Sequence, residues 1–100
     1  MDIKVVTICG SMRFFKQMQK IATELELKNG WCVIQCVYDL ESQNPTKQQM
    51  NNIVNAHFKK IDISDAIFVV NVDGYIGEST KNEIQYAKSK NKEILYLEDI

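Results

Sequence analysis

Four short apolar runs alternate with three amphipathic segments along the chain, and this alternation restricts the fold more than any other feature. The apolar runs, rich in β-branched residues, are "IKVVTIC", "WCVIQCVY", "DAIFVVNV" and "EILYLEDI". Each run but the last is followed by a segment whose apolar residues recur at helical spacing. Buried strands that alternate with helices form a parallel sheet, because every connection between parallel strands must cross one face of that sheet.

The three helical segments have recognisable stripes and boundaries. The first covers residues 11–30 and has Gly30 placed to end it, with a stripe formed by Phe14, Met18, Ile21 and Leu25. The second starts after the loop "ESQNP", and its stripe consists of Met50, Ile53, Val54, His57 and Ile61. In the third, which follows the loop "DGYIGEST", Ile84 and Ala87 should face inward.

We therefore expect one α/β domain over residues 1–100. The simplest arrangement is a small doubly wound parallel sheet, flavodoxin-like or Rossmann-like, of four strands in the order 2-1-3-4 with helices on both faces. Ligands of such sheets bind beyond the carboxyl ends of the strands, where the strand order reverses. The loops that should face this crevice are "CGSMR", "YDLES" and "NVDGYIGEST".

Charge and hydropathy exclude several classes of partner. The net charge is -1 and no basic run exceeds Lys59-Lys60, so we expect no binding to a nucleic acid polymer. No apolar stretch is long enough to cross a bilayer, and "MDIKVVTIC" has no leader pattern, so we expect a cytoplasmic protein without a membrane partner.

Three cysteines lie in or beside the apolar runs. An odd number of thiols outside a secretory context predicts that Cys9, Cys32 and Cys36 are reduced and buried. A zinc site needs about four ligands, and the single histidine, His57, lies far along the chain from the cysteines. We therefore expect no metal site and no cofactor.

The turn after the first strand is a candidate anion or hydroxyl site. Gly10 and Ser11 lie where a strand turns into a helix, so free backbone N–H groups point toward the crevice, with Arg13 nearby. The alternative is a tight turn in which Ser11 caps the helix and Arg13 faces solvent. The turn matches neither the Walker pattern nor the dinucleotide fingerprint.

The loop "DGYIGEST" is the second candidate. Gly74 and Gly77 permit a positive φ or close approach of the backbone to a ligand, and Ser79 and Thr80 stand at a helix start. Asp73 directly follows the third strand. It could accept hydrogen bonds from sugar hydroxyls at the crevice rim, or it could shape the turn together with Gly74.

Two ionisable side chains each have two interpretations. Thr80-x-x-Glu83 fits a capping box, yet a carboxylate near a helix start can also remain ionised and act as a nucleophile. His57 lies on an apolar stripe and fits a core residue, yet an imidazole at the crevice could protonate a departing base. Tyr38 and Tyr75 could stack on a base or simply pack.

The segments "CGSMR" and "HFKKIDISDAIFVVNVDGYIGESTKNEIQYA", with this order of elements, resemble the nucleoside 2-deoxyribosyltransferase superfamily, which includes the 2′-deoxynucleoside 5′-phosphate N-hydrolases. The resemblance covers nearly all of the chain, and its specific parts are Gly10-Ser11 and the block from His57 to Ala87. It implies that Glu83, followed four residues later by Ala87, is the nucleophile that attacks the anomeric carbon.

The resemblance also implies binding residues and a substrate class. Ser11, Ser79 and Thr80 match the groups that hold the 5′ end of the sugar, and Arg13 matches an arginine of the hydrolase branch. His57 stands where the family usually has an aspartate that assists at the leaving base. The chain has four strands where the family commonly has five, which leaves a bare sheet edge and implies a homodimer or larger homo-oligomer.

These observations lead to a hypothesis and an alternative. The hypothesis is cleavage or transfer at the N-glycosidic bond of a nucleoside or nucleotide, with a covalent sugar ester on Glu83 and a proton supplied by His57 or water. The alternative is a nucleotide-binding or sensor module that has the crevice without the chemistry.

Overall fold

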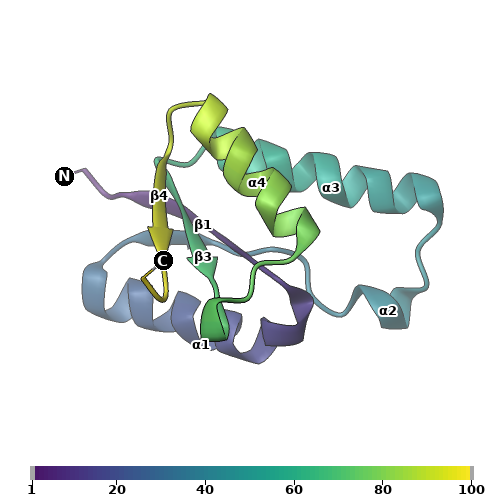
Figure 1. Ribbon diagram of the computed structural model, residues 1–100, viewed down its shortest axis with the longest axis horizontal. Coiled ribbons are helices and arrows are strands. Elements are labelled where there is room, and N and C mark those ends of the chain that lie inside the picture. Colours follow the sequence, from purple (N-terminus) through teal and green to yellow (C-terminus); the bar gives the residue numbers. More distant parts are fainter. Residues whose placement is uncertain (1, 100) are drawn as a thin grey trace.

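The computed structural model describes residues 2–99, and it contains one four-stranded parallel sheet (Figure 1). The strands are β1 (Val5–Gly10), β2 (Cys32–Ile34), β3 (Ala66–Val70) and β4 (Glu93–Tyr96). Their order is β2-β1-β3-β4, and all neighbouring pairs are parallel. The small doubly wound α/β fold predicted from the sequence is confirmed.

The central strand β1 pairs in parallel with a neighbour on each side. Thr7 of β1 pairs with Ile34 on one side and with Ile67 on the other. The second strand is shorter than its apolar run predicts, because the chain leaves the sheet at Gln35. The carbonyl of Gln35 accepts a hydrogen bond from Lys60 Nζ at 3.0 Å, directly after β2 ends at Ile34.

One face of the sheet is covered by the first helical segment (Figure 1). The segment opens with the short η1 (Met12–Phe14), continues as α1 (Phe15–Glu24) and finishes as the wider turns of η2 (Leu25–Asn29). Gly30 ends it with a left-handed φ of 68°, as its position in the sequence predicts. The buried side chains on this face are Ile8, Met18, Ala22 and Val70.

The opposite face is covered by α3 (Lys47–Asp62) and α4 (Glu78–Ser89) (Figure 1). A capping box starts α3: Thr46 Oγ1 accepts from the Gln49 N–H at 3.1 Å, and Gln49 Oε1 accepts from the Thr46 N–H at 2.9 Å. The core between these helices and the sheet is built from Cys9, Ile61, Ile67, Val69, Ile84 and Ala87.

Three details differ from the sequence-based expectations. Met50 and Val54 are exposed although they lie on the apolar stripe of α3, because the first half of α3 extends past the sheet (Figure 1). The segment expected to be a loop contains the short helix α2 (Leu40–Gln43). Cys32 is exposed because it lies on the edge strand β2, and Cys36 is only partly buried, so Cys9 is the one cysteine in the core; all three are free thiols.

Candidate active site

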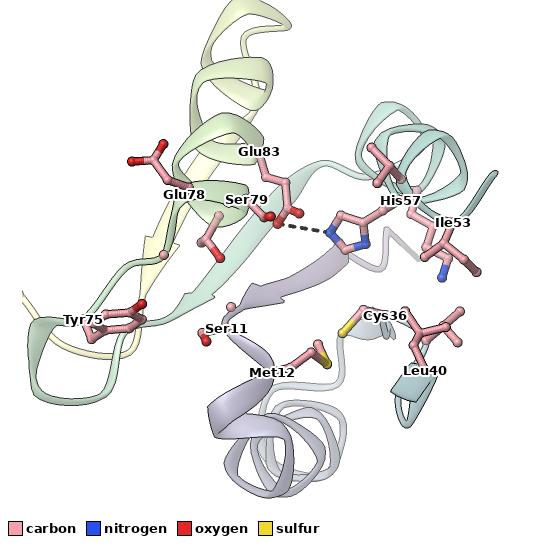
Figure 2. A pocket seen from close by; sticks show the side chains of 16 residues that line it. Ser11, Met12, Cys36, Leu40, Ile53, His57, Tyr75, Glu78, Ser79 and Glu83 are labelled. Atoms are coloured by element: carbon pink, nitrogen blue, oxygen red, sulfur yellow. Dashed lines mark ion pairs between the residues drawn. The ribbon is translucent and has the colours of Figure 1, made fainter. Parts of the chain in front are cut away.

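A cavity of about 380 Å³ opens where the strand order reverses, beside the carboxyl end of β1 (Figure 2). Its walls come from the turn after β1, the segment after β2, one side of α3 and the start of α4. Of the ten residues that the sequence predicts for the site, the cavity is lined by Gly10, Ser11, His57, Gly77, Ser79, Thr80 and Glu83. The fold therefore gathers two distant segments of the chain around one hollow, of a size typical for small ligands.

The other three predicted residues do not line the cavity. The Arg13 guanidinium lies over the ring of Tyr75, with its Cζ 3.8 Å from the ring centroid, and Tyr75 itself lines the cavity. Asp73 adopts a positive φ of 55° and its N–H donates to Glu98 Oε2 at 2.8 Å, while Gly74 has a φ of 77°. Asp73 and Gly74 thus shape the turn, which was the alternative interpretation for this pair.

The turn after β1 is both a helix cap and a cavity wall. Ser11 Oγ accepts a hydrogen bond from the Arg13 N–H at 3.3 Å, so it caps η1 while it faces the cavity. A Cβ added at Gly10 would lie 3.3 Å from Met18 Sδ and 3.3 Å from Val70 Cβ. A larger residue here would therefore force Met18 or β3 to shift by a few tenths of an ångström, and glycine avoids this close contact.

Glu83 faces the cavity and is not a helix cap. The N-cap of α4 is Gly77, which has no side-chain cap, and Thr80 is the third residue of the helix and is buried. The capping-box interpretation of Thr80 and Glu83 is therefore wrong. Glu83 lies in the second turn, too far along the helix for a strong effect of the dipole, and its side chain is 18% exposed.

His57 stands between Glu83 and a buried thiol. Its Nε2 atom is 3.4 Å from Glu83 Oε1 (Figure 2) and, on the buried side, 3.5 Å from Cys9 Sγ. One ring nitrogen faces both groups, so a single N–H can donate to only one of them. Burial, followed by the negative charge of Glu83, raises the pKa of the Cys9 thiol well above its ordinary value. Cys9 is therefore a neutral S–H group that can donate to its neighbours.

Sequence reasoning missed several residues of the site. Lys60 lines the cavity, and its position three residues after His57 on the same helix could have indicated it. Glu78 lines the cavity at its mouth, and Cys36 lines the wall formed by the segment that follows β2. Burial raises the pKa of the Cys36 thiol. Tyr38 does not line this cavity, whereas Tyr75 does.

Cys9 was missed for a different reason. It is separated from His57 by 48 residues, and chain separation was the ground on which a metal site was not expected. In the folded protein this separation along the chain does not keep the groups apart, because the donor atoms of Cys9, His57 and Glu83 all lie within 4.8 Å of one another. Pairing of β1 with β3 and packing of α3 and α4 on the same face bring the three side chains together.

The fold and the site define a small Rossmann-like α/β protein with a carboxylate and an imidazole in the cavity at its switch point. No protein-family model matches the chain, and a search of curated proteins finds no match. Within residues 2–99, none of the helices is long and apolar enough to cross a bilayer.

Proposed function

We propose that the protein cleaves or transfers at the N-glycosidic bond of a nucleoside, a deoxynucleoside or its 5′-monophosphate, with Glu83 as nucleophile. The observation that carries this proposal is the direction of the Glu83 carboxylate. It faces a cavity that is also lined by the Gly10-Ser11 turn and by Ser79 and Thr80 at the start of α4. The hydroxyl groups beside Glu83 on α4, and the hydroxyl and backbone N–H groups of the turn after β1 across the cavity, suit the hydroxyls or phosphate of a sugar.

The chemistry follows that of a retaining glycosidase. A Glu83 oxygen attacks the anomeric carbon, the C1′–N bond breaks, and its electron pair goes to the base nitrogen, which takes a proton. Water or a second base then attacks the sugar ester and regenerates the Glu83 carboxylate. The proton required by the departing base comes from His57 or from water, since His57 is the imidazole beside the nucleophile.

The neighbours of Glu83 fit a group that must stay reactive. Its carboxylate is held by His57 at 3.4 Å rather than by a strong cationic partner at short range. The neutral Cys9 thiol supplies a weak donor on the buried side. Such partners orient the carboxylate without neutralising it, which leaves one oxygen free to attack a ligand in the cavity.

The test is release of free base from a panel of ribonucleosides, deoxynucleosides and their 5′-monophosphates, followed by chromatography in the presence of a chelator. Glu83→Gln should reduce release at least about 10³-fold, because it removes the nucleophile and keeps the shape. Glu24→Gln is the matched control, since Glu24 lies on α1, on the opposite face of the sheet, and does not line the cavity. Equal activity of wild type and Glu83→Gln would remove Glu83 as nucleophile.

A nucleotide-binding or sensor module remains the alternative, and the same panel distinguishes it. The observation that favours it is that the histidine beside Glu83 points Nε2 toward Glu83 and Cys9. Tight binding of one nucleotide with no base released at any protein concentration would select the sensor.

A further inference from the structure

We propose that Cys9, His57 and Glu83 form a zinc site, with one ion per chain and one coordination position open to the cavity. The three side chains offer a sulfur, a nitrogen and an oxygen, and their donor atoms lie within 4.8 Å of one another. Cys9 and His57 are buried and Glu83 is largely buried, so the surrounding protein fixes all three. The site uses the carboxylate of the proposed nucleophile but does not depend on that function.

The distances fit tetrahedral coordination. With Zn–N and Zn–O bonds of about 2.0–2.1 Å and a Zn–S bond of about 2.3 Å, the ligand atoms of a tetrahedron stand about 3.3 Å apart for N and O and about 3.5 Å apart for N and S. His57 Nε2 lies 3.4 Å from Glu83 Oε1 and 3.5 Å from Cys9 Sγ. Two of the three separations are thus nearly those that one ion requires, and the third, between Cys9 Sγ and the Glu83 carboxylate, is at most 4.8 Å and would close to about 3.5 Å on the ion.

Charge also favours a divalent ion in this position. Binding releases the Cys9 thiol proton to solvent and needs the His57 proton on Nδ1, so that the Nε2 lone pair faces the metal. The thiolate and the Glu83 carboxylate then balance the two positive charges, and the neutral imidazole adds none. A mixed set of sulfur, nitrogen and oxygen donors suits zinc and disfavours magnesium or calcium, which take oxygen ligands.

The fourth coordination position of the zinc ion, which no protein ligand fills, determines how the ion would affect reactions in the cavity. Three protein ligands and an open position are the pattern of zinc sites that exchange ligands, whereas structural sites are closed by four. Zinc bound to Glu83 would occupy the carboxylate, which could not attack a sugar at the same time. If the proposed function holds, zinc is therefore an inhibitor of base release.

Titration of the reduced protein with Co²⁺, without substrate, tests the site directly. We expect a thiolate-to-cobalt charge-transfer band and intense visible bands of a four-coordinate ion, both saturating at one equivalent and abolished by Zn²⁺. The double variant Cys32→Ser/Cys36→Ser keeps Cys9 as its only cysteine and should retain the charge-transfer band. Cys9→Ser should lose that band and weaken Zn²⁺ binding at least about a hundredfold, more than the loss of an outer contact would.

Circular dichroism and Cys9→Ala as a second variant show whether a lost band reflects a lost ligand or a lost fold. The proposal is overturned if the folded wild type gives no thiolate band, or if the band persists in Cys9→Ser. Base release measured with a chelator tests the glycosidic function alone. Cobalt binding without base release leaves the zinc site standing, and base release without cobalt binding removes it.

Discussion

At the scale of the residue, His57 has one nitrogen directed at two partners, and this decides what the imidazole can do for a reaction. Nε2 lies 3.4 Å from the Glu83 carboxylate and 3.5 Å from the Cys9 thiol. A proton on Nε2 orients Glu83, and it can reach a leaving base only if the substrate displaces that contact. Positioning and proton donation are therefore separable roles for the same side chain.

The variant His57→Asn separates them. If His57 protonates the leaving base, base release from natural nucleosides should fall about 10²- to 10⁴-fold, while a deoxyriboside with an acidic phenol as leaving group, which needs no proton, should lose far less. The measurement is kcat/KM for the two substrate types. An equal loss for both would assign His57 to positioning Glu83 rather than to donating the proton.

The buried Cys9 thiol should make the free energy of unfolding decrease as the pH becomes alkaline. Its pKa is raised in the folded state by burial and then by the charge of Glu83, while a thiol in the unfolded chain titrates near about 8.5. Its stabilising contribution is complete below that value and is lost progressively as pH rises toward the folded-state pKa. Urea unfolding at pH 7.5 and 9.5, with reductant and chelator, should show a larger loss for wild type than for Cys9→Ala. An equal loss of stability in wild type and Cys9→Ala would contradict the pH effect expected from the buried thiol.

At the scale of the element, Asn71 joins the end of β3 to the segment after β4. Asn71 is fully buried; its Nδ2 donates to the Glu98 carbonyl at 3.0 Å and its Oδ1 accepts from the Glu98 N–H at 2.9 Å. The turn of Asp73, which leads into the cavity wall, follows directly. This pair of bonds therefore fixes the direction in which the chain leaves the sheet toward α4.

Replacement of Asn71 by alanine leaves both backbone groups of Glu98 without their partners. We expect the free energy of unfolding to fall by about 1–3 kcal/mol, because two part-buried hydrogen bonds between Asn71 and the Glu98 backbone are lost. Glu98→Ala is the matched control, since it removes only the exposed bond to the Asp73 N–H and should cost less than about 1 kcal/mol. Urea unfolding measures both, and equal losses would contradict a special role for the buried amide.

The helix starts show how far local sequence predicts elements. The proline of "ESQNP", Pro45, marks the start of α3 to within two residues, and the capping box of Thr46 and Gln49, which the expectation did not include, fixes it. Thr80 marks the start of α4 wrongly. Ile76 packs against the core just before the helix, so the chain turns at Gly77, and Thr80 enters the helix as a buried residue. Tertiary packing therefore outweighed a good local cap.

The sequence predicts those parts of the candidate site whose positions follow from strand order alone. Gly10, Ser11 and the start of α4 meet because the carboxyl ends of β1 and β3 are neighbours. Arg13 could not be placed in this way, since its position depends on stacking over Tyr75. Cys9 could not be placed either, because its contacts depend on how α3 and α4 pack over the same face of the sheet.

At the scale of the whole molecule, the two edge strands of the sheet, β2 and β4, determine where two chains could associate. Within residues 2–99, β2 and β4 each pair with one neighbour, so each leaves one edge unpaired. Such edges are sites of association between chains. We expect a homodimer, whose mass by light scattering would be about twice the 11.6 kDa of one chain and whose radius of gyration would exceed the 13.2 Å of a single chain. A fully active species with the mass of one chain would contradict the expectation.

Ligand binding should stabilise the whole molecule, because the cavity walls belong to elements on both sides of the strand-order reversal. A nucleotide that contacts the turn after β1, α3 and the start of α4 binds only when all of them are folded. At a ligand concentration of about 100 times Kd the stabilisation is about 2.7 kcal/mol, which raises the Tm of a domain this size by about 10–20 °C.

Thermal unfolding with the nucleotide panel, in the presence of a chelator, measures this shift. Glu83→Gln should keep the shift while it loses base release, since the proposed role of Glu83 is to react with the sugar rather than to hold it. A shift that disappears in Glu83→Gln would make Glu83 a binding group, and its neighbours His57 and Cys9 would then serve recognition instead of chemistry. If no nucleotide raises the Tm of the wild type, the cavity takes a different class of ligand, and the arrangement around Glu83 must be explained without a sugar.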